Sequence, residues 1–294
     1  MMIYIVENDI LRVKVSSLGA ELQSIRRTDT DIEYLWQGDP AYWGRRASNL
    51  FPICGRLAGG CYAYNGKTYE MGAHGFARNM EWSVLHQKAD SLTLQLLPTE
   101  DTRLQYPFRF ALEMTYALSG NTLSVTTIVH NKDEAVMPFA VGGHPGFNVP
   151  LTDDEVFEDY RVEFDVPCQP EWLDLDPITC GFTGKYKALP LEEGRYLPLH
   201  HRLFDGDAIF MRNMPREITM KSQKSGHSVR VEYPDSPYVG LWHNPGTDAP
   251  FVCIEPWVMP PAPAGTPEKL TEKDGMIHLE AGNTYRNLYT ITVD

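Results

Sequence analysis

The chain has 294 residues and a formal net charge of −13, which argues against nucleic acid as a partner because phosphate binding requires a basic surface. Its hydrophobic content of 43% and charged content of 22% are ordinary for a soluble globular protein. The five cysteines form no C-x-x-C pair, which favours free thiols in a reducing compartment. With no signal-peptide pattern and no long apolar run, we expect a cytoplasmic protein without a membrane partner.

Apolar and polar residues alternate in many segments, from the beginning of the chain to its end. In such a segment every second side chain faces the same side, which is typical of half-buried and mostly antiparallel strands. The clearest examples are 11–15, 92–96, 112–118, 123–129, 218–220, 229–233 and 289–293. The pattern predicts an all-β protein built as a large antiparallel sheet sandwich.

The connections between these segments agree with this fold class. Asn65-Gly66 favours a tight hairpin, and Ser119-Gly120-Asn121 joins two alternating segments as a second hairpin. No amphipathic segment is long enough for a helix of three or more turns, although 267–270 fits one short turn. Because there is no internal repeat and no long linker, we expect a single domain over 1–294, with 260–265 as a rigid surface loop.

Three short segments carry groups that can move or share a proton. They are 73–78 with His74, 142–148 with His144, and 253–257 with Glu255. Each lies in or beside a predicted strand, among glycines, prolines or aromatics. Two histidines and a carboxylate that folding brings together would make an acid–base site.

His144 and Glu255 are the most informative of these residues. Pro145-Gly146 is expected to end the strand, so that His144 stands at a strand-end turn, although a histidine bonded to a local carbonyl is the plainer alternative. Glu255 ends the apolar run 251–254, and a carboxylate there must face a cleft or be paired. Partial burial would raise its pKa towards that of a general base, and the alternative is a buried ion pair with an arginine.

Other polar residues near these segments are candidates for substrate contacts. Arg56 and Arg78 lie next to glycine-rich turns and offer a fork of donors, although either alone is more often a surface group. Asp207 suits a hydroxyl-rich ligand, Asp205 is equally a turn residue, and His243 is a candidate for lining the pocket. Flat rings that either contact a ligand or fill the core are Phe76, Phe147, Trp242 and Trp257.

Several other chemistries have no support in the sequence. No His-x-x-x-His or Cys/His cluster has metal-ligand spacing, and there is no P-loop, dinucleotide fingerprint or G-x-S-x-G elbow. Cys54 and Cys253 lie in apolar surroundings, which favours a place in the core. We therefore expect a site that uses neither a metal nor a cofactor.

The order of these motifs resembles that of the aldose 1-epimerase (galactose mutarotase-like) superfamily, most closely its LacX-like branch. The resemblance spans nearly the whole chain and implies a large β-supersandwich. One departure is the proline-rich segment 258–263, which can reshape the rim of the site. The motifs are Gly55-Arg56, His74-Gly75-Phe76-Ala77-Arg78, Gly142-Gly143-His144-Pro145-Gly146-Phe147, a segment around Asp207, and Cys253-Ile254-Glu255-Pro256-Trp257.

The resemblance also implies a reaction. Glu255 would take the proton from the anomeric hydroxyl of a cyclic hexose while His144 protonates the ring oxygen, and closure after rotation would give the other anomer. His74 would hydrogen-bond the substrate. We expect the imidazole and the carboxylate to face each other across a gap sized for one pyranose. By the same resemblance, the residues that hold hydroxyls or a phosphate are Arg56, Arg78 and Asp207.

Three alternatives to a free-hexose epimerase remain open at this point. A hexose-6-phosphate 1-epimerase is one, because two arginines can clamp a phosphate. A carbohydrate-binding or sensor protein without turnover is another, although it would need neither an acid nor a base. A glycosidase is weaker, because hydrolysis usually requires two suitably spaced carboxylates and only Glu255 is a firm candidate.

Overall fold

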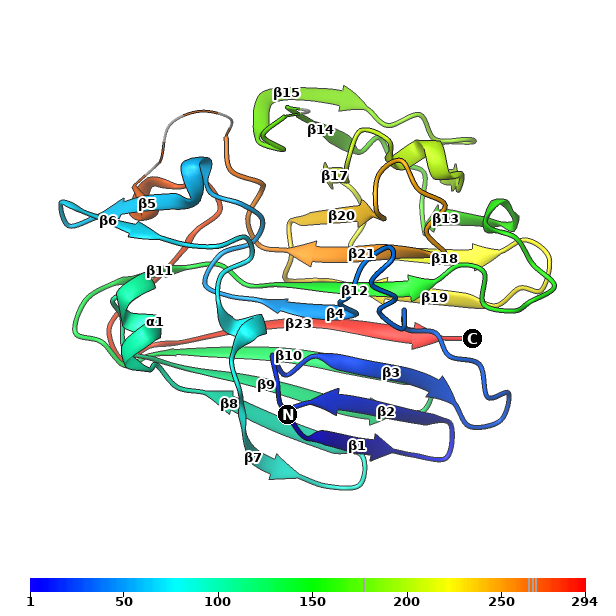
Figure 1. Cartoon of the computed structure of the whole chain (residues 1–294). Coiled ribbons are helices and arrows are strands. Elements are labelled where there is room, and N and C mark those ends of the chain that lie inside the picture. Colours follow the sequence, from blue (N-terminus) through cyan, green and yellow to red (C-terminus); the bar gives the residue numbers. More distant parts are fainter. Residues whose placement is uncertain (177, 264, 266, 268) are drawn as a thin grey trace.

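Two large sheets form most of the computed structural model, which describes residues 1–176, 178–263, 265, 267 and 269–294 (Figure 1). The nine-stranded sheet contains β7 (Ser83–Gln87), β8 (Ser91–Leu96), β9 (Phe110–Ser119), β10 (Thr122–Asn131), β13 (Tyr160–Phe164), β16 (Tyr196–Pro198), β18 (Glu217–Ser222), β19 (Ser228–Glu232) and β23 (Thr284–Val293). Their spatial order is β16-β13-β18-β19-β23-β10-β9-β8-β7.

The seven-stranded sheet carries two of the three candidate segments, 142–148 and 253–257. It contains β4 (Ala47–Leu50), β12 (Gly142–Asn148), β14 (Glu171–Leu175), β15 (Phe182–Ala188), β17 (Ile209–Arg212), β20 (Tyr238–Trp242) and β21 (Phe251–Trp257). Their spatial order is β15-β14-β17-β20-β21-β12-β4, so β12 and β21 are neighbours near one end of the sheet.

Smaller elements complete the fold. Three further sheets pair β1 (Ile3–Glu7), β2 (Leu11–Ser16) and β3 (Leu22–Arg27); β5 (Cys61–Tyr64) and β6 (Lys67–Glu70); and β11 (Met137–Phe139) and β22 (Ile277–Leu279). The helical pieces are α1 (Glu100–Gln105) and the 3-10 turns η1 (Ala58–Gly60), η2 (Ala77–Asn79), η3 (Phe157–Asp159), η4 (His201–Phe204) and η5 (Leu270–Glu272). In the described part of the chain, no helix has the length and hydropathy needed to cross a membrane.

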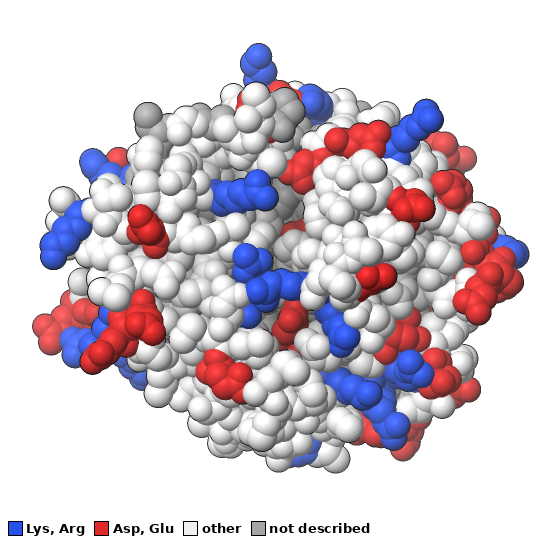
Figure 2. Space-filling view, viewed as in Figure 1, with Lys and Arg blue, Asp and Glu red and all other residues white. Residues whose placement is uncertain are grey.

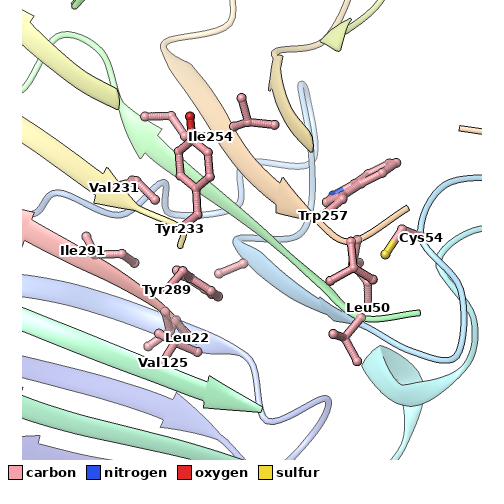
Figure 3. Close-up of a cluster of buried hydrophobic side chains, with 14 of the residues drawn as sticks. Leu22, Leu50, Cys54, Val125, Val231, Tyr233, Ile254, Trp257, Tyr289 and Ile291 are labelled. Atoms are coloured by element: carbon pink, nitrogen blue, oxygen red, sulfur yellow. The ribbon is translucent and has the colours of Figure 1, made fainter. Parts of the chain in front are cut away.

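The core lies between the two large sheets. Figure 3 shows side chains of β10, β19 and β23 gathered with others from β21 and β4 in one buried cluster. The sheets approach closely at Gly143, where a Cβ would lie 2.8 Å from Tyr289 Oη. Glycine at this position therefore lets β12 pack against β23. The labelled members of the cluster are Leu22, Leu50, Cys54, Val125, Val231, Tyr233, Ile254, Trp257, Tyr289 and Ile291.

The prediction of an all-β antiparallel sandwich is confirmed. Each alternating segment lies in a strand, namely β2, β8, β9, β10, β18, β19 and β23, with Tyr233 just beyond the end of β19. Both predicted hairpins form, and Asn65 and Gly66 have the positive φ values, 48° and 74°, that a tight turn of this kind requires. The ladders between the named strands in the described part of the chain are all antiparallel.

The structure corrects three details of the sequence-based prediction. Helix α1 was not anticipated; Thr99 caps it by accepting from the backbone N–H of Thr102 at 3.2 Å. The short turn near 267–270 begins only at Leu270, and residue 268 lies outside the described part. Of the predicted surface loop 260–265, residues 260–262 are buried, and the N–H of Phe182 in β15 donates to Ala262 O at 2.8 Å. Residues 263 and 265 are exposed as predicted, and residue 264 is not described. The single-domain boundary stays a prediction.

Candidate active site

The register between β12 and β21 brings His144 and Glu255 together. The two strands are antiparallel, and Gly146 pairs with Cys253. Two residues back along β12 and two residues forward along β21, the same register places His144 directly opposite Glu255. Opposed residues of an antiparallel pair project from the same face of the sheet, so their side chains must meet.

The expectation that His144 ends its strand was wrong. β12 continues through Pro145 to Asn148, which leaves His144 in the middle of the strand. Proline is tolerated here because the β12–β21 ladder is interrupted between its paired positions, and Pro256 on the facing strand also lacks an N–H donor. Pro145 and Pro256, which were expected to end their strands, therefore lie where the β12–β21 ladder has no paired positions, next to His144 and Glu255.

The two side chains touch each other directly. His144 Nε2 lies 3.4 Å from Glu255 Oε2, and the residues are only 7% and 4% exposed. The expected pyranose-sized gap between them is therefore absent, and a ligand has to bind over both groups from one side. Within the described part of the chain Glu255 makes no ion pair with an arginine, so the alternative of a structural arginine–glutamate pair is also wrong.

Burial sets the protonation of this pair. The pKa of His144 is lowered to about 3, first because burial disfavours the imidazolium and then because Arg78 and Arg45 add positive charge. The pKa of Glu255 is raised well above its usual value, first by burial and then by the negative charge of Asp207. Both shifts favour the uncharged forms, an imidazole without the extra proton and a carboxyl group that keeps its proton.

His74 adds a fixed hydrogen-bond donor beside the pair. The backbone N–H of Gly55 donates to the ring nitrogen Nδ1 of His74 at 3.1 Å, and the backbone N–H of His74 donates to Gly55 O at 2.6 Å. Burial first, and then repulsion from His144 in its protonated form, lowers the pKa of His74 well below its usual value, so the ring is neutral. A neutral ring whose Nδ1 accepts must carry its proton on Nε2. The His74 and His144 rings meet edge to face at 5.4 Å.

Aromatic rings enclose the two histidines. Trp43 stacks on His144 with ring centroids 4.8 Å apart, while Trp242 meets the same imidazole edge to face at 5.7 Å. Trp257 lies edge to face against His74 at 5.5 Å. Trp43 was missed by the sequence analysis, since it belongs to the irregular segment before β4. Of the other rings considered there, Phe76 and Phe147 are core residues.

Arginines without carboxylate partners surround this site. Arg45, a second residue that the sequence analysis missed, donates to Arg78 O at 3.3 Å and to Asn79 Oδ1 at 2.5 Å. Burial, followed by the charge of Arg45, lowers the pKa of Arg78 to about 10, and Arg78 Nε is buried with no partner in the described part of the chain. Among the described residues, Arg45, Arg56 and Arg78 form no ion pair. Figure 2 shows Lys and Arg side chains gathered around the hollow of this face.

Asp207 and Arg56 lie nearer the surface than the His144–Glu255 pair. Asp207, with φ at 79°, accepts a hydrogen bond from Trp242 Nε1 at 3.0 Å. The exposed Arg56 donates to Cys180 Sγ at 3.6 Å. Burial, followed by a hydrogen bond to Asp207, raises the pKa of the Cys180 thiol, so this thiol contacts both predicted residues. All six predicted site residues thus lie in or around one region, although their roles stay predictions.

His243 does not line the site. Its side chain is fully buried and lies against His201, with Nδ1 of His201 and Nε2 of His243 separated by 3.3 Å. Phe157, Phe204 and Phe251 pack around it. The expectation that His243 lines a pocket was therefore wrong, because its ring packs in the core against Phe204 and His201.

Comparison with known proteins identifies the family. The family model described as Aldose 1-epimerase matches residues 2–292. The chain belongs to this family. Protein LacX (chromosomal) of Lactococcus lactis subsp. lactis is 35% identical over 259 residues, which cover 85% of this chain and 86% of that protein. The resemblance inferred from the motifs is thereby confirmed.

Solved structures agree with this assignment. A galactose mutarotase related enzyme from Lactobacillus acidophilus has a TM-score of 0.94 and 35% identity, covering 100% of this chain and 97% of that one. A galactose mutarotase-like protein from Lactobacillus casei ATCC 334 has a TM-score of 0.93 and 32% identity, with 100% of both chains covered. Family membership makes the protein an isomerase that acts on carbohydrates.

Proposed function

We propose that the protein is a cofactor-independent aldose 1-epimerase that interconverts the α and β anomers of a hexose. The observation that carries the proposal is the contact between His144 Nε2 and Glu255 Oε2, 3.4 Å apart on one face of the sheet. The anomeric oxygen O1 and the ring oxygen O5 of an aldopyranose are bonded to the same carbon. A base and an acid that are direct neighbours can therefore reach both oxygens at once.

The reaction requires one proton to leave O1 and one to reach O5. Glu255 accepts the proton of the O1 hydroxyl, and the electrons of that bond form the C1=O1 double bond. The C1–O5 bond breaks, and its electron pair on O5 takes the proton that His144 donates. After rotation about C1–C2, the same transfers in reverse close the ring as the other anomer.

The protonation of the pair fits this cycle. Burial favours the form with the proton on Glu255 and a neutral His144, which is the form that accompanies the open-chain aldehyde. Ring opening starts from the other form, with the proton on His144, and transfer between two atoms 3.4 Å apart connects the two forms. No proton has to be exchanged with solvent during turnover, because both forms hold one proton.

Neighbouring residues have roles in orientation. The Nε2–H of His74 donates to a substrate oxygen, and Trp43 and Trp242 hold the imidazole of His144 in place while keeping water away from it. Asp207, on the outer side, accepts from a sugar hydroxyl with the oxygen that Trp242 leaves free. We place the reaction in the cytoplasm, which accords with five cysteines that are all free thiols.

The direct test is anomer exchange measured by NMR exchange spectroscopy or polarimetry. Glucose, galactose and their 6-phosphates are each supplied with increasing amounts of enzyme. The proposal predicts that exchange of at least one sugar accelerates in proportion to enzyme concentration. Saturable binding of a sugar without any acceleration would overturn the proposal and favour a carbohydrate-binding protein.

A hexose 6-phosphate is a second candidate substrate, favoured by the unpaired arginines. In a protein with net charge −13, Arg45 and Arg78 lie side by side without a carboxylate partner among the described residues, so a bound phosphate would satisfy both. The phosphate cannot be on C1, because mutarotation needs a free anomeric hydroxyl. A higher kcat/KM for glucose 6-phosphate or galactose 6-phosphate than for the free sugar would support this candidate, and equal values would exclude it.

A further inference from the structure

Cys253 is a buried thiol that the proposed reaction does not use. It lies on β21 two residues before Glu255, and alternate residues of a strand share a face, so its sulfur points to the same side as the catalytic carboxylate. The residue is fully buried, as the sequence analysis expected of a core cysteine. Its surroundings, however, include both members of the acid–base pair.

Cys253, His144 and Glu255 together form a set of metal-binding donors. One ligand atom from each, a thiol sulfur, an imidazole nitrogen and a carboxylate oxygen, lie within 4.8 Å of one another. Ligand atoms around a tetrahedral Zn²⁺ are separated by about 3.3 to 3.7 Å, given the usual Zn–S, Zn–N and Zn–O bond lengths. The distance of 3.4 Å between His144 Nε2 and Glu255 Oε2 already falls in this range. The cysteine sulfur, within 4.8 Å of both other donors, has to approach them by about 1 Å to reach the separations of a tetrahedral site.

The charge of the set also suits a divalent cation. A thiolate, a carboxylate and a neutral imidazole carry two negative charges, so a bound M²⁺ gives a complex without net charge in a buried place. Because a thiolate and a carboxylate are the forms that bind a cation, Cys253 and Glu255 must both be deprotonated in the complex. Trp43, stacked on His144, limits access of water to the complex.

We infer that a thiophilic divalent cation such as Zn²⁺ binds to His144, Cys253 and Glu255 and blocks the acid–base pair. Three protein ligands leave the fourth tetrahedral position open to water or a sugar oxygen. The cation occupies the atoms that would exchange protons with O1 and O5, so it competes with the substrate. Metal binding itself is independent of the proposed function, and only the inhibition rests on it.

Co²⁺ is the probe for the binding part, because a cobalt–thiolate bond gives a charge-transfer absorption in the near ultraviolet. Metal-free protein titrated with Co²⁺ should show this band with one ion per chain, and added Zn²⁺ should remove it. Cys253→Ser should weaken Co²⁺ binding at least tenfold and abolish the band. Cys54→Ser, a change at another fully buried thiol, is the matched control and should keep the band.

A second variant keeps the test decisive if Cys253→Ser does not fold. Glu255→Gln removes the carboxylate ligand and should also weaken Co²⁺ binding at least tenfold while the cobalt–thiolate band of the residual complex remains. Absence of the band in the unaltered protein, or the same affinity in both variants as in the unaltered protein, would overturn the inference.

Inhibition supplies the second readout. Zn²⁺ should slow anomer exchange and raise the apparent KM for the sugar, and each variant is compared with its own metal-free rate. Cys253→Ser should need at least tenfold more Zn²⁺ than the unaltered protein. A cobalt band without any epimerase activity would show that the metal site exists and that the proposed function fails. If Zn²⁺ does not affect the anomer exchange and no cobalt–thiolate band appears, the metal site is rejected while the proposed function stands.

Discussion

His144 and Glu255 occupy opposed positions of β12 and β21, so that their side chains meet at 3.4 Å on one face of the sheet. This relationship follows from a backbone register and not from a flexible loop. In the proposed reaction, it places the proton donor and the proton acceptor within reach of the two oxygens on the anomeric carbon. Groups fixed by two paired interior strands would need little reorganisation during the proposed reaction, which favours catalysis by positioning.

Replacement of His74 by asparagine separates its structural and functional hydrogen bonds. Asparagine tolerates the positive φ of 64° and can accept from Gly55 N–H as Nδ1 does, but it has no counterpart of Nε2–H. We expect His74→Asn to fold normally and to lose about 10- to 100-fold in kcat/KM, the value of one hydrogen bond to a charged or polarised oxygen. Steady-state anomer exchange checks this, and an unaltered kcat/KM would remove His74 from the site.

Replacement of Arg78 tests whether the site recognises a phosphate on the substrate. Arg78→Met removes a half-buried guanidinium that has no carboxylate partner among the described residues. We expect the ratio of kcat/KM for a hexose 6-phosphate to that for the free hexose to fall at least about tenfold, because a charge-assisted bond is lost. Arg109→Met, at a surface arginine near Asp133 and Glu134, is the matched control and should leave the ratio unchanged. A ratio that Arg78→Met does not alter would exclude phosphate recognition by this arginine.

Gly75 is required for the turn that presents His74. Its φ is +70°, and a Cβ would lie 2.2 Å from the carbonyl oxygen of Phe51, which already accepts from Phe76 N–H at 3.1 Å. Gly75→Ala should therefore cost about 3 kcal/mol or more in unfolding free energy. Gly66→Ala has a similar φ of +74° but open space around it, so it should cost only about 1 kcal/mol. Urea denaturation measures the unfolding free energy of both variants. Equal losses would contradict the prediction, because they would mean that the Cβ at position 75 finds room beside Phe51.

The buried, neutral His243 should make the unfolding free energy depend on pH. Burial lowers its pKa to about 4, with His201 adding positive charge and Asp205 opposing it. An unfolded histidine titrates near 6.5, so the stability from keeping His243 neutral is full above that pH and is lost as pH falls from 6.5 towards 4. The loss between pH 7 and 5 should be up to about 2 kcal/mol. Urea denaturation at pH 7 and pH 5 measures this loss of unfolding free energy, and it should be smaller in His243→Gln than in the unaltered protein. An equal loss in both proteins would contradict the assignment of the pH dependence to His243.

Much of the fold could be predicted because period-two alternation and turn residues report local structure. The segments of β9 and β10, with Gly120 between them, are clear from the sequence alone. The prolines beside His144 and Glu255 were misread as strand ends, because a proline inside a central strand is allowed only where the neighbouring strand does not need its N–H. That condition depends on register, which no local pattern reveals.

The candidate site was predicted where its residues lie in distinctive motifs, and missed elsewhere. Trp43 and Arg45 flank Gly44 in an irregular segment, and that glycine was the only local signal. Their positions depend on contacts between distant segments, such as the stacking of Trp43 on His144 and the bond from Arg45 to the backbone of Arg78. Likewise, Cys253 looked like a core residue, because only the β12–β21 pairing shows what lies beside its sulfur.

The most direct measurement is the anomer-exchange rate of Glu255→Gln compared with that of Glu113→Gln. Glu113 also lies 3.4 Å from a histidine, His130, but that pair is partly exposed on the nine-stranded sheet, so it is a matched control for a general effect of removing a glutamate. We predict that Glu255→Gln loses about 10²- to 10⁴-fold in kcat while it still binds the sugar, and that Glu113→Gln keeps its rate. Equal rates in Glu255→Gln and the unaltered protein would contradict the account.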